Sequence, residues 1–165
     1  MRNRTMLFLM ISLLMAVGCQ QTDRLLDQNE VFDNQIWEQD RLVTFEVEIA
    51  DTVNSFDFNL NLRNSMNYPF RNLYFLYSIK DQNGNLVLSN QEQLMLFSKS
   101  GKPLGASSGI LGIDFGDEYY SSNKFLTHQF KKAGKYTVSV SQNMRGQQEL
   151  NGVMLVGVKI SPSNK

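Results

Sequence analysis

The sequence predicts an all-β protein, a single antiparallel β-sandwich that follows a cleaved lipoprotein signal peptide. Three observations predict this fold class. Apolar and polar residues alternate over several short stretches, no stretch of the mature chain keeps a helical period, and turn residues separate the stretches. Roughly eight short strands favour a jelly-roll or immunoglobulin-like sandwich, and the strand order stays open.

The first 19 residues have the layout of a bacterial lipoprotein signal. Arg2 and Arg4 form a basic start, residues 6–17 are almost entirely apolar, and small residues lead to Cys19, the only cysteine. As a helix the apolar run covers about 18 Å, which is too short for a hydrocarbon core of roughly 30 Å. Cleavage after Gly18 is therefore expected, with S-diacylglycerol and N-acyl chains on Cys19. A plain signal peptide with a chance cysteine is the alternative.

The composition of the mature chain limits its partners. Removal of residues 1–18 takes away two arginines and leaves 147 residues with 14 basic and 16 acidic side chains. A chain of about 150 residues buries close to 70% of its unfolded surface, so one core is sufficient. The near-neutral balance, without a basic run, argues against nucleic acid and against electrostatic adhesion to membranes. Membrane attachment then depends on the acyl chains of Cys19.

The predicted domain organisation has three parts. Residues 1–18 are the signal peptide, residues 19–30 a lipid-anchored polar tether, and residues 31–162 the β-sandwich. As a flexible coil, about ten tether residues have an end-to-end distance of about 17–19 Å, and about 35 Å when stretched. The sandwich is therefore expected to work close to the bilayer.

The strands are predicted in chain order after a polar segment, residues 31–37, whose apolar pairs are expected to lie against the edge of the domain. Residues 43–49 and 56–63 alternate strictly and predict half-buried strands. Residues 73–80 and 153–160 have apolar side chains at both odd- and even-numbered positions, which predicts central strands with both faces covered. Further strands are expected at residues 86–88, 94–97, 124–130 and 136–140, with hairpin turns at 81–85 and 131–135.

A possible hydrolase motif is weak in this context. Residues 105–109 fit the pattern G-x-S-x-G, and Ser107 is followed by Asp114 and His128 in the order of a catalytic triad. The motif requires the strand–turn–helix of an α/β sheet, which this pattern does not contain. We interpret the glycines as loop formers and His128 as a partly buried strand residue, so we expect neither an enzyme nor a cofactor. With no second histidine and no cysteine nearby, a zinc site is not expected.

Two binding sites remain as alternatives. Asp114, Asp117 and Glu118 could hold calcium through carboxylate oxygens, although an exposed acidic loop is the commoner meaning of such a run. The glycine of residues 81–84 comes two positions early for a calcium loop, so we interpret this segment as a hairpin turn. The second alternative is a glycan-binding lipoprotein of a polysaccharide-uptake system. It requires exposed aromatic side chains that stack on sugars, and the candidates are Trp37, Tyr74, Tyr77, Tyr119 and Tyr120.

A series of short segments carries a family resemblance. In order they are Val31-Phe32 with Trp37, Asp51-Thr52, Leu62-Arg63-Asn64, residues 68–73, Gly84-Asn85, residues 101–105, residues 134–138, Met144-Arg145, residues 150–153 and Val156-Gly157. Together with the signal peptide and Cys19, this series resembles the GldH family of gliding-motility lipoproteins of Bacteroidetes. The resemblance covers essentially the whole mature chain.

The resemblance implies a place and a class of partner. It implies an envelope lipoprotein of the gliding apparatus, linked to type IX secretion and to the movement of surface adhesins. Other envelope proteins of this machinery are then the expected partners, without a small-molecule substrate or catalytic residues. Gln20 and Gln21 follow Cys19 where an inner-membrane lipoprotein would have aspartate, so the outer membrane is favoured. The absence of an acidic cluster after Cys19 favours its periplasmic face.

Overall fold

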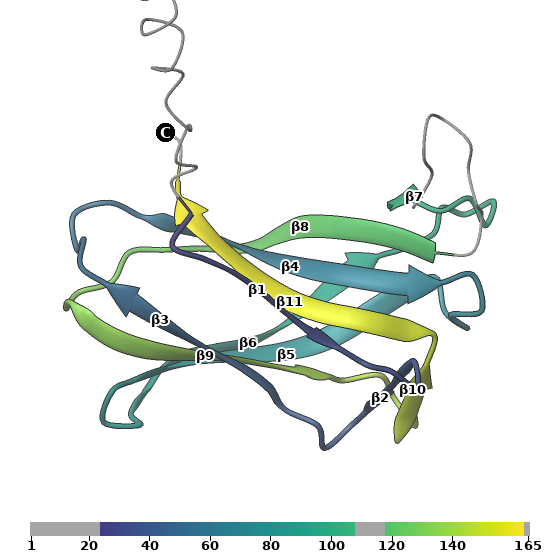
Figure 1. Cartoon of the computed structure of the whole chain (residues 1–165), viewed down its shortest axis with the longest axis horizontal. Helices are drawn as coiled ribbons and strands as arrows, with labels where there is room; N and C mark the ends of the chain where they lie inside the picture. Colours follow the sequence, from purple (N-terminus) through teal and green to yellow (C-terminus); the bar gives the residue numbers. More distant parts are fainter. Residues whose placement is uncertain (1–23, 108–117, 164–165) are drawn as a thin grey trace, which may run out of the picture.

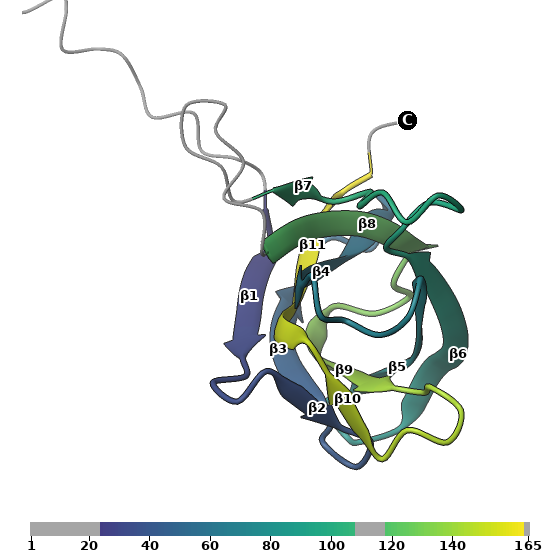
Figure 2. The same cartoon turned by 90° about the vertical axis from the view of Figure 1, so that its right-hand side faces the viewer.

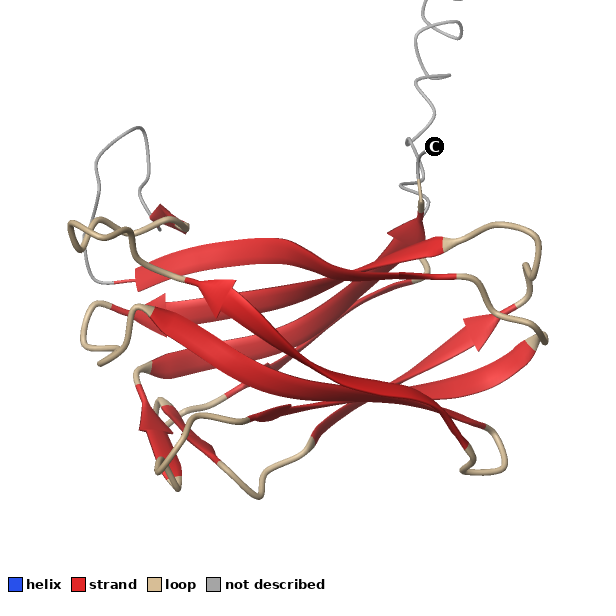
Figure 3. Cartoon of the chain, turned by 180° about the vertical axis from the view of Figure 1, so that it is seen from behind, coloured by secondary structure: helices blue, strands red, loops and turns tan. Residues whose placement is uncertain are grey.

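The computed structural model describes residues 24–107 and 118–163. These residues form eleven β-strands and no helix, in antiparallel sheets that face each other as a sandwich (Figures 1 and 3). The predicted all-β sandwich is confirmed. One sheet has the order β1-β11-β4-β8-β7, the facing sheet has the order β3-β9-β5-β6, and the short pair β10-β2 lies at one end. Figure 2 looks along the strands and shows both sheets around the core.

The strands predicted at 43–49, 56–63, 73–80 and 153–160 are confirmed within two residues at each end. The prediction of separate strands at 86–88 and 94–97 is wrong, because one strand runs through both, and the strand predicted at 124–130 begins six residues earlier. The five-stranded sheet contains β1 (Leu26–Val31), β11 (Val153–Pro162), β4 (Phe56–Ser65), β8 (Glu118–His128) and β7 (Ala106–Ser107). The four-stranded sheet contains β3 (Val43–Ile49), β9 (Gly134–Gln142), β5 (Asn72–Asp81) and β6 (Leu86–Met95). The small sheet contains β2 (Ile36–Glu38) and β10 (Glu149–Asn151).

The core lies between the two large sheets and is rich in aromatic rings. Tyr77 and Phe125 lie 4.8 Å apart between ring centroids, and Phe75 meets Phe125 edge-on at 5.5 Å. These contacts join β5 to a bulged part of β8, where the pairing with β4 shifts register after Phe58. Ring pairs at such distances add to the free energy gained by burying apolar area. The two sheets are therefore held together without a disulfide among the described residues.

The two strands predicted to be covered on both faces, β5 and β11, differ in structure. On β11 buried residues occur at both odd and even positions between Val153 and Ile160, and only Met154 and Lys159 in this range are half-buried. On β5 only the inward parity is buried, and Leu76 on the outer face is 40% exposed, so the prediction of two covered faces is wrong for β5. The outer face of β11 is covered because side chains of the neighbouring β1 lie across it at Gly157.

The polar segment before the sandwich also differs from the prediction. The tether was predicted to extend to Glu30, but β1 begins at Leu26 and pairs with β11 from Leu26↔Ile160 to Val31↔Leu155. Only Leu26 of this strand is buried. Because β1 is an edge strand with exposed side chains, it needs no apolar alternation and its sequence resembles a linker. The covalent link between Cys19 and the sheet is correspondingly shorter.

Candidate functional site

The end of the sandwich at which the chain enters β1 gathers the loops with the most distinctive chemistry. Leu25 donates its N–H to the carbonyl of Ile160, at the end of β11, over 2.9 Å. Phe56 pairs with both Pro162 and His128, so the end of β8 lies beside this point. We call this the tether end; it comprises Arg24 and Leu25 with the loops 50–55, 82–85 and 129–133 (left in Figure 1).

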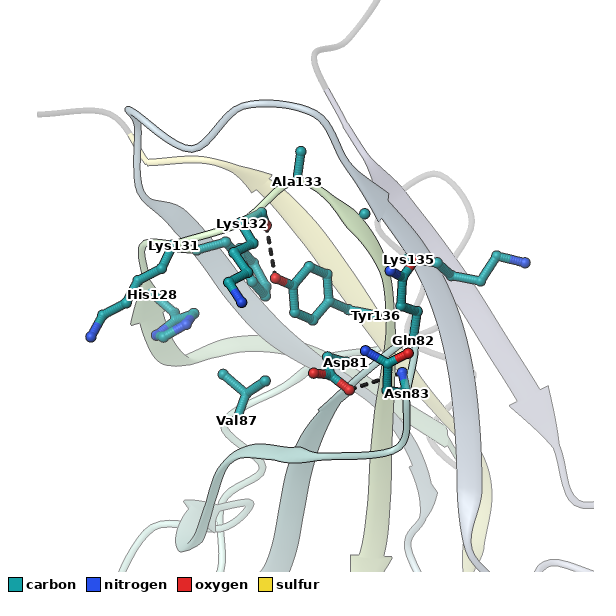
Figure 4. A pocket seen from close by; sticks show the side chains of 12 residues that line it. Asp81, Gln82, Asn83, Val87, His128, Lys131, Lys132, Ala133, Lys135 and Tyr136 are labelled. Carbon is teal, nitrogen blue, oxygen red and sulfur yellow. Dashed lines mark hydrogen bonds between the residues drawn. The ribbon is translucent and has the colours of Figure 1, made fainter.

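A cleft of 480 Å³ opens at the tether end between the turn 82–85 and the loop 129–133 (Figure 4). Four strands provide its walls, with His128 from β8, Tyr136 from β9, Asp81 from β5 and Val87 from β6. Its floor is aromatic, because the Phe130 ring lies 4.4 Å from Tyr136 and 4.8 Å from His128. The Tyr136 hydroxyl donates to the carbonyl of Lys132 over 2.7 Å and fixes the loop above it.

The rim of the cleft is cationic. Lys131 and Lys132 are exposed, and Lys135 forms an ion pair of 3.2 Å with Glu46. Burial, with a smaller effect of the nearby Lys131 charge, lowers the pKa of His128 below its ordinary value. The imidazole is therefore neutral near pH 7.

The carboxylate of Asp81 is occupied by its own turn. Its Oδ1 accepts the N–H groups of Asn83 and Asn85, each over 2.9 Å. The hydrogen bond from the Asn85 side chain is the main cause that lowers the pKa of Asp81, and the Lys132 charge adds to the effect. With its oxygens used in this way, Asp81 forms the hairpin turn that the sequence predicts. The lining of the cleft contains no serine or cysteine.

The hydrolase candidates do not come together. Ser107 lies on β7 and pairs with Tyr119, near the start of β8, whereas His128 is the last residue of that strand. Nine residues of extended chain span about 30 Å. Asp114 lies outside the described residues. The two described members of the motif are therefore at opposite ends of β8, and the serine hydrolase hypothesis is wrong for this arrangement.

Only one of the three calcium candidates belongs to the described residues. Asp114 and Asp117 lie outside the described residues, and Glu118 begins β8 with a carboxylate oxygen 4.0 Å from a guanidinium nitrogen of Arg63. Within residues 24–107 and 118–163, no three histidine, cysteine or acidic side chains gather as metal ligands.

The five aromatic candidates do not form a sugar-binding platform. Trp37, Tyr77 and Tyr119 are buried, and the Trp37 indole donates to the carbonyl of Arg41 over 3.0 Å. The two remaining side chains, Tyr74 and Tyr120, are carried by β5 and β8, which belong to opposite sheets. One sugar chain cannot stack on both. The glycan-binding alternative thus loses the geometry on which it depends.

A row of polar side chains on the outer face of the five-stranded sheet was not predicted. Asn61, fully buried on β4, donates through Nδ2 to Asp27 and Asn29 of β1, each over 3.0 Å. Ser122 of β8 donates to Asn61 Oδ1 over 2.8 Å. Gly157 lies between Asn29 and Asn61 in the register. All polar atoms of the Asn61 side chain are used, so the row fastens β1 to the sheet.

The predicted lipidation site, Cys19 after Gly18, lies outside the described residues. The part of the chain that the structure describes contains no helix with the length and apolar character needed to cross a bilayer.

Comparison with known proteins gives relatives that match most or nearly all of the chain. A gliding motility lipoprotein GldH homolog of Christiangramia forsetii is 32% identical over 171 residues, covering 99% of each chain. The gliding motility lipoprotein GldH of Flavobacterium johnsoniae is 28% identical over 139 residues, covering 81% of this chain and 86% of its own.

Solved structures are similar only in part. The insecticidal delta-endotoxin Cry8Ea1 of Bacillus thuringiensis aligns with a TM-score of 0.41 and 11% identity, over 78% of this chain and 19% of its own. The CBM36-1 domain of a multidomain xylanase from the hindgut metagenome of Trinervitermes trinervoides aligns with a TM-score of 0.40 and 15% identity, over 89% of this chain and 95% of its own.

The family assignment rests on the sequence comparison. The family profile described as GldH lipoprotein matches residues 24–160, which is almost the entire described domain. The match begins two residues before β1 and ends within β11. It agrees with the resemblance seen in the short sequence segments, and the chain belongs to the GldH lipoprotein family.

Proposed function

We propose that the protein is a lipid-anchored, non-catalytic component of the gliding apparatus that acts through contacts with other envelope proteins and is coupled to type IX secretion. The observation that carries the proposal is the match of residues 24–160 to a lipoprotein family whose relatives are named for gliding motility. In the printed sequence, Cys19 stands five residues before this domain.

The proposed anchor is Cys19, with cleavage after Gly18 and acyl chains on the sulfur and the new amino group. Two or more chains give a stable anchor, whereas one chain binds a membrane only reversibly. The outer membrane, on its periplasmic face, is the proposed location because Gln20 and Gln21 follow the cysteine. Retention of the domain at this surface then depends mainly on the lipid.

The absence of catalysis is proposed from the chemistry of the described surface. The cleft at the tether end brings His128 near Lys131, and its lining contains no serine or cysteine. Nucleophilic catalysis needs a nucleophile within hydrogen-bond reach of its base. Contacts with partner proteins therefore account better for a role in motility than turnover of a substrate does.

The test is a deletion of the gene in a gliding host, with the wild-type gene supplied in trans as the control. Deletion should abolish colony spreading and the movement of single cells on glass, and the wild-type gene should restore both. A secreted type IX cargo, measured in the medium, should fall in the same strain. Normal movement and normal secretion in the deletion strain would overturn the proposal. If movement is lost while secretion stays normal, only the proposed coupling to secretion is overturned.

A further inference from the structure

We propose that the tether end of the sandwich rests on the bilayer, with the side chains of Val53, Leu86 and Val87 in the interfacial region. These three residues are called the apolar tips. The inference rests on the proposed anchoring at Cys19 and adds a fixed orientation to it. The surface is thus assigned to the membrane, and the opposite end of the sandwich is left free for partner proteins.

The length of the tether decides which parts of the domain can reach the membrane. From Cys19 to Arg24 the chain advances by five residues, which extend to at most about 18 Å. The ten residues of β11 span about 33 Å, and β11 ends beside Leu25. With the acyl chains of Cys19 in the bilayer, the tether end is held at the surface, while upright strands carry the far end well away from it.

The apolar tips are aliphatic side chains that are exposed to solvent in the isolated chain. Val53 is 80% exposed in the loop between β3 and β4, and Leu86 and Val87 are 61% and 41% exposed at the start of β6. Both segments lie at the tether end, because Ile49 pairs with Gly134 and Asp81 pairs with Tyr136. Aliphatic side chains in this position lose contact with water when they enter the membrane interface.

The loop that carries Val53 is held in shape by hydrogen bonds. Asp51 Oδ1 accepts the N–H groups of Val53 and Asn54 over 2.7 and 3.1 Å. From the neighbouring loop, Gln129 Nε2 donates to the carbonyls of Thr52 and Val53 over 3.0 and 3.1 Å. The backbone around the tip is thus largely paired within the protein, which reduces the cost of moving it toward a region poor in water.

The charges at the tether end fit the headgroup level of a bilayer. Lys131 and Lys132 are exposed beside the apolar tips, and their long stems let the ammonium groups reach lipid phosphates. The nearby acids Asp51 and Asp81 accept hydrogen bonds within their own turns. Arg24 is paired with Asp27 over 2.8 Å, so the three cationic side chains of this end stand against three acidic ones. Because these charges balance, apolar contact and the anchor hold this end, and anionic lipid should have only a small effect.

The two sheet faces are poorer candidates for the same contact. The outer face of the five-stranded sheet carries the polar row with Asp27 and Asn61, and that of the four-stranded sheet carries Glu46 and Glu48. Carboxylates and amides lose hydration at a membrane interface without gaining a partner. An upright domain is therefore favoured over one that lies on a face.

The test compares two leucines of nearly equal exposure at opposite ends, Leu86 at 61% and Leu42 at 58%. Because Cys19 is the only cysteine and acylation blocks its thiol, Leu86→Cys or Leu42→Cys gives one labelling site in the acylated chain. The labelled, acylated protein is placed in vesicles of phosphatidylethanolamine with a minority of phosphatidylglycerol. The dye at position 86 should be quenched by nitroxide lipids and shielded several-fold from aqueous iodide, whereas the dye at position 42 should not.

The second variant and the other outcomes complete the test. Val53→Ser with Val87→Ser, at two exposed positions that leave the core intact, should reduce the shielding at position 86. Equal access of iodide to both dyes overturns the orientation. Shielding without quenching by nitroxide lipids shows that a second copy covers this end and also overturns it. Mass spectrometry of the same sample shows whether Cys19 is acylated, and an unmodified cysteine overturns the anchoring proposal and this inference together.

Discussion

The substitution Gly157→Ala tests how β1 is fastened to the sheet. A Cβ atom at position 157 would collide with the Asn29 side chain and the Gln28 carbonyl of β1, and would lie 2.8 Å from Asn29 Cγ. Gly157 has no positive φ angle, so the cost arises from the close approach of two strands and not from backbone strain.

The size of the effect follows from two contributions. Overpacking of this kind typically costs about 1–3 kcal/mol. If β1 moves away, Asn61 also loses its bonds to Asp27 and Asn29, each of which contributes about 1 kcal/mol or somewhat more for the charged acceptor. Partial relaxation reduces the sum, and we expect a loss of about 2–4 kcal/mol of unfolding free energy. A domain of this size has about 5–15 kcal/mol in total.

The assay is urea unfolding of the mature chain that carries Cys19→Ser. Unfolding is monitored through the fluorescence of the single tryptophan, Trp37, which is fully buried in the native state. Gly84→Ala is the matched control, because its φ is +79° and no atom lies within 4 Å of the added Cβ. It should cost about 1 kcal/mol through the backbone alone. A loss for Gly157→Ala no larger than that of the control would refute the reasoning.

Three further substitutions test other parts of the fold. Trp37→Phe should cost about 1 kcal/mol because it removes the hydrogen bond to the Arg41 carbonyl, measured by urea unfolding followed by circular dichroism. Gly152→Ala should cost about 2–4 kcal/mol, since its φ is +81° and the Cβ would lie 2.8 Å from backbone atoms of Tyr68. Because the pKa of His128 is lowered in the folded state, the unfolded chain takes up its proton first, and stability should fall as the pH drops through 6.5 and level off below the folded pKa. His128→Gln should flatten this part of a plot of unfolding free energy against pH, and an unchanged slope would contradict the assignment.

The strands that face both core and solvent could be predicted because their side chains alternate. In β3 every second residue from Val43 to Ile49 is buried, which is the pattern visible in the sequence. β1 is paired in the same antiparallel way, but Leu26 is its only buried residue. Its sequence therefore lacks the apolar alternation from which a strand could be predicted. The pair of β2 and β10 was also not predicted, because strands of three residues are too short to show a period and Trp37 is buried by tertiary contacts.

The candidate site was less visible in the sequence than the fold. Residues 131–135 were predicted as a hairpin turn, but β8 and β9 lie in different sheets and β9 already begins at Gly134, so this segment crosses from one sheet to the other. Turn residues reveal a chain reversal but not the sheet to which the next strand belongs. The cleft forms because pairing between distant strands brings Asp81 and His128 to the same end. The Ser107 motif was misleading for the opposite reason, since β8 keeps its two described members apart. Spacing along the chain does not determine proximity in an antiparallel sandwich with crossed connections.

The assignment of the tether end to the membrane divides the surface into two functional parts. Leu42 and Leu104, 58% and 57% exposed, lie at the far end and point to the side on which partners would be met. The cleft and its lysines then face lipid, not partner protein. Substitutions at the far end are expected to impair motility without releasing the protein from the membrane. Substitutions at the apolar tips are expected to change the orientation of the domain on the membrane before they affect its contacts with partners.

The most direct test of the central claim, that the domain acts where its lipid holds it, is single-cell movement of a strain whose only copy lacks the anchor. In this strain Cys19→Ala is combined with an ordinary secretory signal, so that the folded domain reaches the periplasm in soluble form. The account predicts that immunoblots show normal amounts of the domain while the cells fail to glide. Full gliding with the soluble domain would contradict it.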